Sequence, residues 1–256
     1  SQDTALPAHV GLTIEGNEMI GCGARNGAGD CLRMQDGLSE VLVRDNLCAD
    51  NVGIGSRGLS TQHIAAARFE SNAFVNVAGT GMVVGGVWGT GTTDVVLARN
   101  IIQDAGADGI YVATDSVDQP IAGVEIANNT ILGSGQTGLV LGRGASTTVD
   151  DVHLANNLVA GSALDGLGGW GELGGCVAAH NNVFQSARVD YAGPFSSCAT
   201  TSGNLNVDPA LSNPAQPSGI DGVFWTDDDG LRPQATSLLC GAGQNGGDIG
   251  ALACHD

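Results

Sequence analysis

A repeat of 25 to 29 residues constrains this chain more than any other feature of its sequence. Seven units align when one asparagine in each unit is taken as the anchor. The anchors are Asn17, Asn46, Asn72, Asn100, Asn129, Asn157 and Asn182. A period of this length is typical of solenoids, in which each unit buries its apolar face only by stacking on its neighbours.

Apolar residues recur at fixed offsets from the anchors. The positions five and three before the anchor and two after it are apolar in all seven units. Their alternation predicts a short β-strand that ends at the anchor. Nine residues after the anchor, four units carry a glycine, which we expect at a corner of positive φ. These glycines are Gly81, Gly109, Gly138 and Gly166, and each is followed by a predicted second strand.

The second strand also has predicted inward positions. They are Met82 and Val84, Ile110 and Val112, Leu139 and Leu141, and Leu167, with Leu32, Met34 and Ile54 in the first two units. Short strands, a fixed asparagine turn and a corner glycine together predict an all-β parallel β-helix of about seven coils. We assign residues 1–200 to the coils and 201–256 to a C-terminal capping segment packed on the same solenoid. A leucine-rich repeat is the competing fold, but its leucine spacing and a helical pattern are absent.

The units Val124–Leu132 and Val152–Val159 resemble the generic coil of the secreted right-handed parallel β-helix proteins, and the tail is similar to the closing segment of many bacterial members. The tail motifs are Asn204–Pro209, Asp229–Pro233, Ser237–Gly243 and Gly247–Ala251. This family includes pectate lyase-like and chondroitinase or alginate lyase-like enzymes. The resemblance implies a pectin lyase-like fold and an extracellular polysaccharide as partner. Family lyases use a lysine or arginine base, often with calcium.

The net charge of the chain and the types of its charged residues exclude several classes of function. The chain carries 9 Lys+Arg against 27 Asp+Glu, a net charge of −18, and all nine cations are arginine. Without lysine, a Schiff base and a phosphate-binding lysine loop are excluded. The negative charge argues against nucleic acid and anionic membranes, and no apolar run approaches the roughly 18 residues of a membrane helix. We therefore expect neither nucleic acid binding nor membrane insertion.

Seven cysteines without a CxxC pair favour disulfides over a zinc site, and hence a secreted protein. Cys48 falls in the inward column and is predicted to be a buried core thiol. Proximity in the sequence then suggests three pairs, although six cysteines permit 15 connectivities. The suggested pairs are Cys22 with Cys31, Cys176 with Cys198, and Cys240 with Cys254.

The loops after the second strands carry the candidate site, because irregular side chains of a solenoid gather on one face. Trp88 and Trp170 are candidate substrate-binding residues, since aromatic faces stack on sugar rings. Asp115 and Glu172 are candidate catalytic carboxylates two coils apart, about 9.6 Å between backbones and near the upper end of the separation in inverting glycosidases. Arg143, on the coil between them, is the third catalytic candidate. The alternative is that these are solvated loop acids with edge-packed tryptophans.

Other acids have structural interpretations. Asp108 and Asp165 precede corner glycines, where Asp-Gly is common turn chemistry. Asp227–Asp229 are predicted to be solvated loop acids. The sequence assigns no set of protein ligands for a metal and no particular cofactor, while calcium at a single carboxylate site stays an open alternative.

Two hypotheses follow for function. The first is a secreted β-helix protein that binds or cleaves a polysaccharide or cell-surface glycan along the loop-lined face, as a glycoside hydrolase or a polysaccharide lyase if it is an enzyme. The second is a non-catalytic extracellular scaffold or adhesin. No capping helix is evident near Ser1, so we expect an upstream domain or chain to cover the N-terminal end of the coils.

Overall fold

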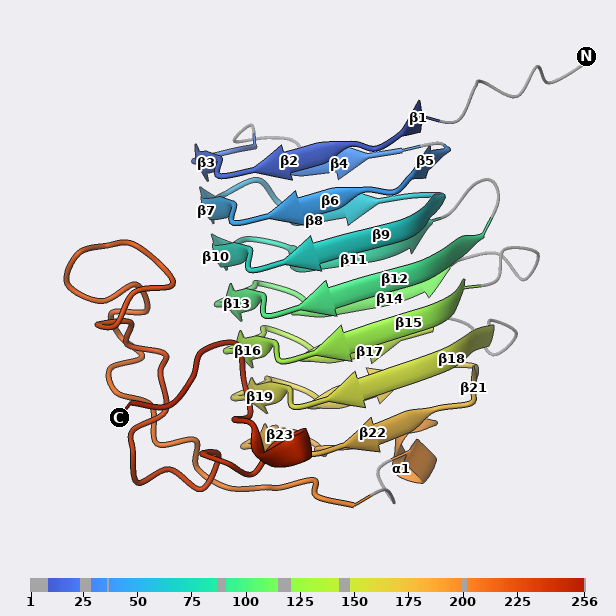
Figure 1. The fold of residues 1–256 in the computed structure, drawn as a ribbon. Helices are drawn as coiled ribbons and strands as arrows, with labels where there is room; N and C mark the ends of the chain where they lie inside the picture. The colour runs from blue at the N-terminus through green and yellow to red at the C-terminus, as the bar shows by residue number, and fades with distance from the viewer. Residues whose placement is uncertain are drawn as a thin grey trace, which may run out of the picture.

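The computed structural model is a parallel β-solenoid whose coils stack along one axis (Figure 1). It describes residues 9–23, 29–35, 37–86, 91–114, 121–142, 148–198 and 202–255. Three parallel sheets run along the stack. Each of the first six coils contributes described strands to all three in turn, whereas the last coil contributes them to sheets A and B. The prediction of an all-β parallel β-helix is confirmed.

Sheet A, of ten described strands, carries the strand that precedes each anchor asparagine. Its longer members are β9 (Ile64–Glu70), β12 (Thr92–Ala98), β15 (Ile121–Ala127) and β18 (Thr148–Ala155). In the first two coils and the last, the equivalent segment is split into two short strands. These are β1 (His9–Val10) and β2 (Thr13–Glu15), β5 (Leu38–Ser39) and β6 (Leu42–Arg44), and β21 (Glu172–Gly174) and β22 (Val177–Ala179).

Sheets B and C complete the triangular coil. The seven described strands of sheet B follow the anchors: β3 (Glu18–Ile20), β7 (Leu47–Asn51), β10 (Ala73–Val77), β13 (Ile101–Gln103), β16 (Thr130–Leu132), β19 (Leu158–Ala160) and β23 (Asn182–Phe184). The six described strands of sheet C are β4 (Leu32–Met34), β8 (Arg57–Thr61), β11 (Thr80–Gly86), β14 (Ile110–Thr114), β17 (Leu139–Leu141) and β20 (Leu167–Gly169).

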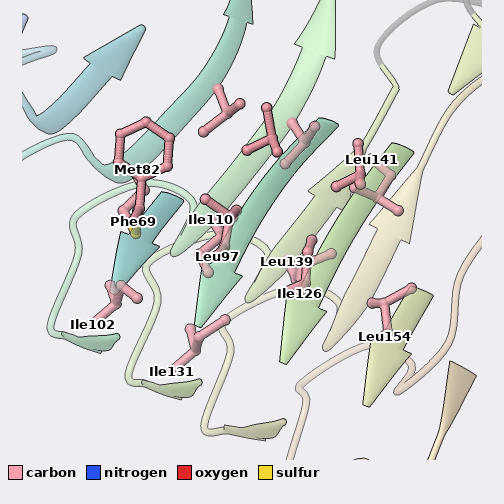
Figure 2. Packing of buried hydrophobic residues seen from close by; sticks show 14 of the residues in the cluster. Phe69, Met82, Leu97, Ile102, Ile110, Ile126, Ile131, Leu139, Leu141 and Leu154 are labelled. Carbon is pink, nitrogen blue, oxygen red and sulfur yellow. The ribbon is translucent and has the colours of Figure 1, made fainter. Parts of the chain in front are cut away.

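The core consists of columns of like side chains, one from each coil (Figure 2). Leu97 pairs in register with Phe69 and Ile126, and Ile102 with Ile131. All five side chains are buried. Stacking places each side chain against its own equivalents, so a β-branched or leucine side chain fits the same space in every coil.

An asparagine ladder runs beside this core. In each rung, the backbone N–H and the side-chain Nδ2 of one asparagine both donate to Oδ1 of the asparagine in the next coil. The bonds link Asn17, Asn46, Asn72, Asn100, Asn129, Asn157, Asn181 and Asn204. The last predicted anchor, Asn182, was wrong by one residue. With Asn181 as anchor, Ala178 and Val183 become the inward residues, and both are fully buried.

Three columns of left-handed residues form the bends of the coil. Their φ values lie mostly between about 50° and 80°, a region that glycine, asparagine and aspartate tolerate best. The first column bends sheet A, the second precedes the ladder, and the third ends sheet B. They comprise Gly11, Glu40, Ala66, Asp94, Gly123, Asp151 and Gly175; then Gly16, Asp45, Ser71, Arg99, Asn128, Asn156, His180 and Gly203; then Gly21, Asp50, Asn76, Asp104, Gly133, Gly161 and Gln185.

The predicted corner glycines act differently from expectation. Gly138 and its equivalents do not have positive φ. A Cβ at Gly138 would instead lie 2.7 Å from the Gly166 carbonyl oxygen and 2.8 Å from Ser162 Oγ on the next coil. These glycines are therefore required by close approach between coils rather than by backbone conformation.

Three further predictions were wrong, and the first concerns Asp229, which is fully buried rather than a solvated loop acid. Ile54 is 87% exposed, and Leu59 takes the inward position of that coil, in register with Leu32 and Met82. Cys48 is buried as predicted but is bonded to Cys31, which leaves Cys22 as the free thiol. The pairs Cys176–Cys198 and Cys240–Cys254 are confirmed.

The tail after residue 201 lies along the outward face of sheet B (Figure 1). Leu231, Leu239 and Ile249 pack there on Ile101 and Leu158, forming a second apolar cluster. The described helices are short: α1 (Phe195–Cys198), whose Phe195 joins the main core, and the 3₁₀ turn η1 (Gln244–Gly246). Neither approaches the length of a membrane-crossing helix.

Candidate functional site

The structure describes two of the five predicted site residues. Trp170 is 56% exposed and lines a groove on the outward face of sheet C. Glu172 opens β21 on sheet A and is exposed, but it is not among the residues that line this groove. Trp88, Asp115 and Arg143 lie outside the described residues.

The groove has a volume of about 430 Å³ and crosses several coils. Its floor comes from outward positions of sheet C, where Val83 in β11 and Tyr111 in β14 are paired in register. Arg57 and Thr80, at the starts of β8 and β11, lie at one end, and Trp170 is on its wall. The groove thus combines two aromatic side chains with hydroxyl and guanidinium donors.

An ion pair stands at the far end of the groove. Arg188 Nε donates to Asp165 Oδ1 at 2.7 Å, and its NH2 group donates to Oδ2 of the same carboxylate. The Asp165 side chain is only 4% exposed, whereas that of Arg188 is 60% exposed. The hydrogen bond and charge of Asp165 raise the pKa of the Arg188 guanidinium. A bidentate pair of this kind fixes the arginine in place at the groove surface.

Asp108, the carboxylate among the described residues that line the groove, also has a structural partner. Asp108 Oδ1 accepts the backbone N–H of Thr137, at 3.1 Å, from the next coil. Asp108 and Asp165 therefore tie neighbouring turns together, in agreement with the structural interpretation of their Asp-Gly pairs. Across the described residues, no group of three or more His, Cys, Asp or Glu side chains is arranged to hold a metal ion.

Sequence reasoning missed several groove residues. Tyr111 stands between the inward residues Ile110 and Val112, so the strand alternation could have placed it on the outward face. No comparable sequence pattern locates Arg188 in the groove. Its position depends on the turn that follows β23 and on its pairing with Asp165, 23 residues away in the sequence.

Comparison with known proteins agrees with this architecture. A family model described as "Right handed beta helix region" matches residues 8–159 and again residues 85–207. Because these matches span most of the chain, the protein belongs to the right-handed β-helix family. No curated protein and no solved structure matches the chain significantly.

Proposed function

We propose that this protein binds an extracellular polysaccharide in the groove over sheet C. The observation that carries the proposal is the exposed Trp170 beside a floor that contains Tyr111. Exposure of a large apolar tryptophan ring to water is unfavourable, and a ligand that covers the ring removes this cost. The flat faces of aromatic rings also suit the apolar faces of sugar rings.

The polar groups of the groove support a glycan as ligand. Thr80, Gln136 and Thr137 supply neutral hydrogen-bonding groups along it. Coils repeat at about 4.8 Å, so successive strands offer similar groups to a polymer of repeating units. Asp165 neutralises Arg188, and the chain as a whole carries a charge of −18. We therefore favour a neutral or weakly charged polysaccharide.

Cleavage is the finer part of the proposal. Asp108 and Asp165 are occupied with neighbouring coils, so catalysis falls to Asp115 and Glu172 as acid and base of a hydrolase, or to Arg143 as base of a lyase. The second candidate function is a non-catalytic scaffold or adhesin. The engagement of Asp108 and Asp165 with neighbouring coils favours it, because a catalytic carboxylate must be free to transfer a proton.

Secretion belongs to the same proposal. Three disulfides, Cys31–Cys48, Cys176–Cys198 and Cys240–Cys254, are typical of proteins that work in an oxidising compartment. A polysaccharide partner would be met in that compartment.

Binding is tested with a panel of neutral and uronate-containing polysaccharides by affinity electrophoresis, with Trp170→Ala as the key variant. We expect at least a tenfold loss of affinity, since the largest exposed aromatic of the described groove is removed. Val10→Ala, at an exposed position of β1 on sheet A that does not line the groove, is the control and should bind normally. Equal binding by Trp170→Ala and the parent would refute the groove as the site.

Cleavage is tested on the same panel, with and without calcium. Reducing ends released by the parent but not by Glu172→Gln or Asp115→Asn would support a hydrolase. Absorbance from new unsaturated uronates, lost in an Arg143→Ala variant, would support a lyase. Binding without product would leave the binding proposal standing and reject catalysis, and no binding to any glycan would favour the scaffold.

A further inference from the structure

A second cavity, remote from the sheet C groove, lies where the tail meets the first two coils. It has a volume of about 200 Å³. One wall is the turn from sheet A to sheet B, with Asn17, Glu18 and Asp45, and the other is the tail segment that contains Phe224 and Trp225. Nothing in the proposed function uses these residues.

The coil wall is rich in hydrogen-bond acceptors. Glu18 and Asp45 contribute carboxylates. In every later rung of the ladder, Oδ1 of the asparagine accepts two bonds from the preceding coil, but no described residue donates to Oδ1 of Asn17. None of the arginines that the structure describes lines the cavity. Arg44, the neighbour of Asp45, is bound through Nε and NH2 to Glu15 at 2.8 and 2.7 Å, and its Nε lies 3.9 Å from Asp45 Oδ2, beyond hydrogen-bond distance. The wall is therefore complementary to a ligand that donates and carries positive charge.

The tail wall presents two aromatic residues. Phe224 and Trp225 are both half-buried in the second apolar cluster while lining the cavity. An ammonium group close to a tryptophan face gains a cation–π attraction, and the apolar edge of a ring packs on the same surface.

The tail segment is built to hold Trp225 in place. Trp225 has φ 72°, a left-handed conformation that is costly for a bulky residue. Oδ2 of the fully buried Asp229 accepts the N–H groups of Trp225 and Thr226 at 2.7 and 3.1 Å. Strained residues that their surroundings hold in place cluster at ligand sites.

A second set of hydrogen bonds holds the rest of the loop. Asp228 Oδ2 accepts the N–H groups of Ile220 and Asp221, and Asp228 Oδ1 accepts the hydroxyl of Thr226. Arg232 Nε donates to the Thr226 carbonyl at 3.0 Å. The aromatic wall is thus preorganised, which lowers the entropy lost when a ligand binds.

We propose that this cavity binds one unit of an amino sugar, a hexosamine with a free amine. The ammonium group lies between the carboxylates of Glu18 and Asp45, the hydroxyls donate to the acceptor wall, and the ring rests on Trp225. The cavity is smaller than the roughly 300–1,000 Å³ pockets of drug-sized ligands, which suits a single ring.

The test uses the fluorescence of Trp225 in the full chain with Trp88→Phe and Trp170→Phe, where Trp225 is the only tryptophan left of three. Glucosamine tetramer should shift the emission in a saturable way, and the N-acetylated tetramer should bind at least tenfold more weakly. Because Trp170 of the polysaccharide groove and Trp88 are both replaced, the signal reports on this cavity alone.

Charge is tested with the isosteric double variant Glu18→Gln/Asp45→Asn, whose sites are exposed and leave the core untouched. It should bind glucosamine tetramer at least tenfold more weakly, while the exchange of Asp50→Asn, an acid outside the cavity, should not change affinity. Equal affinity for the amine and N-acetyl forms, an unchanged affinity in the double variant, or saturable binding of a lysine-rich peptide but no amino sugar would each overturn the proposal.

Discussion

The coils and the tail differ in how they satisfy the hydrogen bonds of their backbone and polar side chains. In the coils each interaction is repeated, as in the ladder bonds of Asn72, Asn100 and Asn129. In the tail, the bonds around Asp228 and Asp229 occur once and join side chains to backbone. Because their interactions repeat, the coils can be recognised from the sequence. The structure of the tail depends on individual contacts that follow no repeat.

The two regions also differ in how a change should spread. A coil bonds to both neighbours along three sheets, so damage to one rung weakens adjacent turns. The tail contacts the solenoid through the second apolar cluster and a few hydrogen bonds, such as Ala251 N–H to Thr130 Oγ1 at 2.9 Å. Loss of one tail contact should therefore act locally.

The largest effect is expected from breaking the ladder in mid-stack. Asn100→Ala removes an acceptor for Asn72 and the donor to the Phe69 carbonyl, all in a buried setting. Several buried polar groups lose their partners, so the free energy of unfolding should fall by about 3–5 kcal/mol. Denaturant unfolding measures this. Asn17→Ala, at the exposed first rung, is the matched control and should cost less than about 1 kcal/mol. Equal losses would contradict the account of the ladder.

A glycine comparison is expected to give a smaller effect. Gly138→Ala pushes a methyl group against the Gly166 carbonyl and Ser162 of the next coil, so it should cost about 2–3 kcal/mol. Gly246→Ala in the tail meets no atom within 4 Å and bears only the cost of φ 76°, about 1 kcal/mol. Thermal unfolding of both variants distinguishes the two causes, and a larger loss at Gly246 would show that the corner glycines are not required by space.

The smallest effect concerns pH in the tail. Burial raises the pKa of Asp229 to about 6, although the N–H groups of Trp225 and Thr226 lower it in part. Because the folded state binds this proton more tightly, the stabilising contribution is present below pH 4 and is lost as pH rises through 6. Asp229→Asn should abolish roughly 1–2 kcal/mol of that decline between pH 4 and pH 7.

Asp228 provides a control of opposite sign. The Thr226 hydroxyl and the Ile220 N–H lower the pKa of Asp228, so its contribution is present at neutral pH and lost in acid. Asp228→Asn should therefore lower stability at pH 7 and not at pH 3. Parallel pH profiles for the two variants, recorded by thermal unfolding, would contradict the assignment of these shifts.

The predictability of the fold depended on unit length. Columns such as Val95, Val124 and Val152 came from units of 28 or 29 residues and are buried as expected. The two errors in position fell in units of other lengths: Ile54 in the step of 26 residues between anchors, and Asn182 in the step of 24. A deletion in a turn shifts every later offset while leaving the ladder intact, so the asparagine is a safer guide than the offset.

The candidate site was less predictable than the fold, because some of its residues are positioned by contacts between distant segments rather than by the repeat. Trp170 comes directly after β20, so the repeat pattern assigns it to a particular coil. Arg188 is instead held at the groove by its ion pair with Asp165, which no repeat pattern indicates. The left-handed columns could have been found from their glycine, asparagine and aspartate content. Trp225, in a left-handed conformation in the tail, follows no repeat, so only the fold could reveal the cavity that it lines.

The central claim, that a polysaccharide lies in the groove over sheet C, is tested most directly by amide hydrogen exchange with and without a bound polysaccharide. The account predicts slower exchange in segments 80–83, 107–111, 136–140 and 164–170, which line or adjoin the groove, and unchanged exchange in the tail segment 222–225. Protection confined to sheet A or to the tail, with no change in the four groove segments, would contradict it.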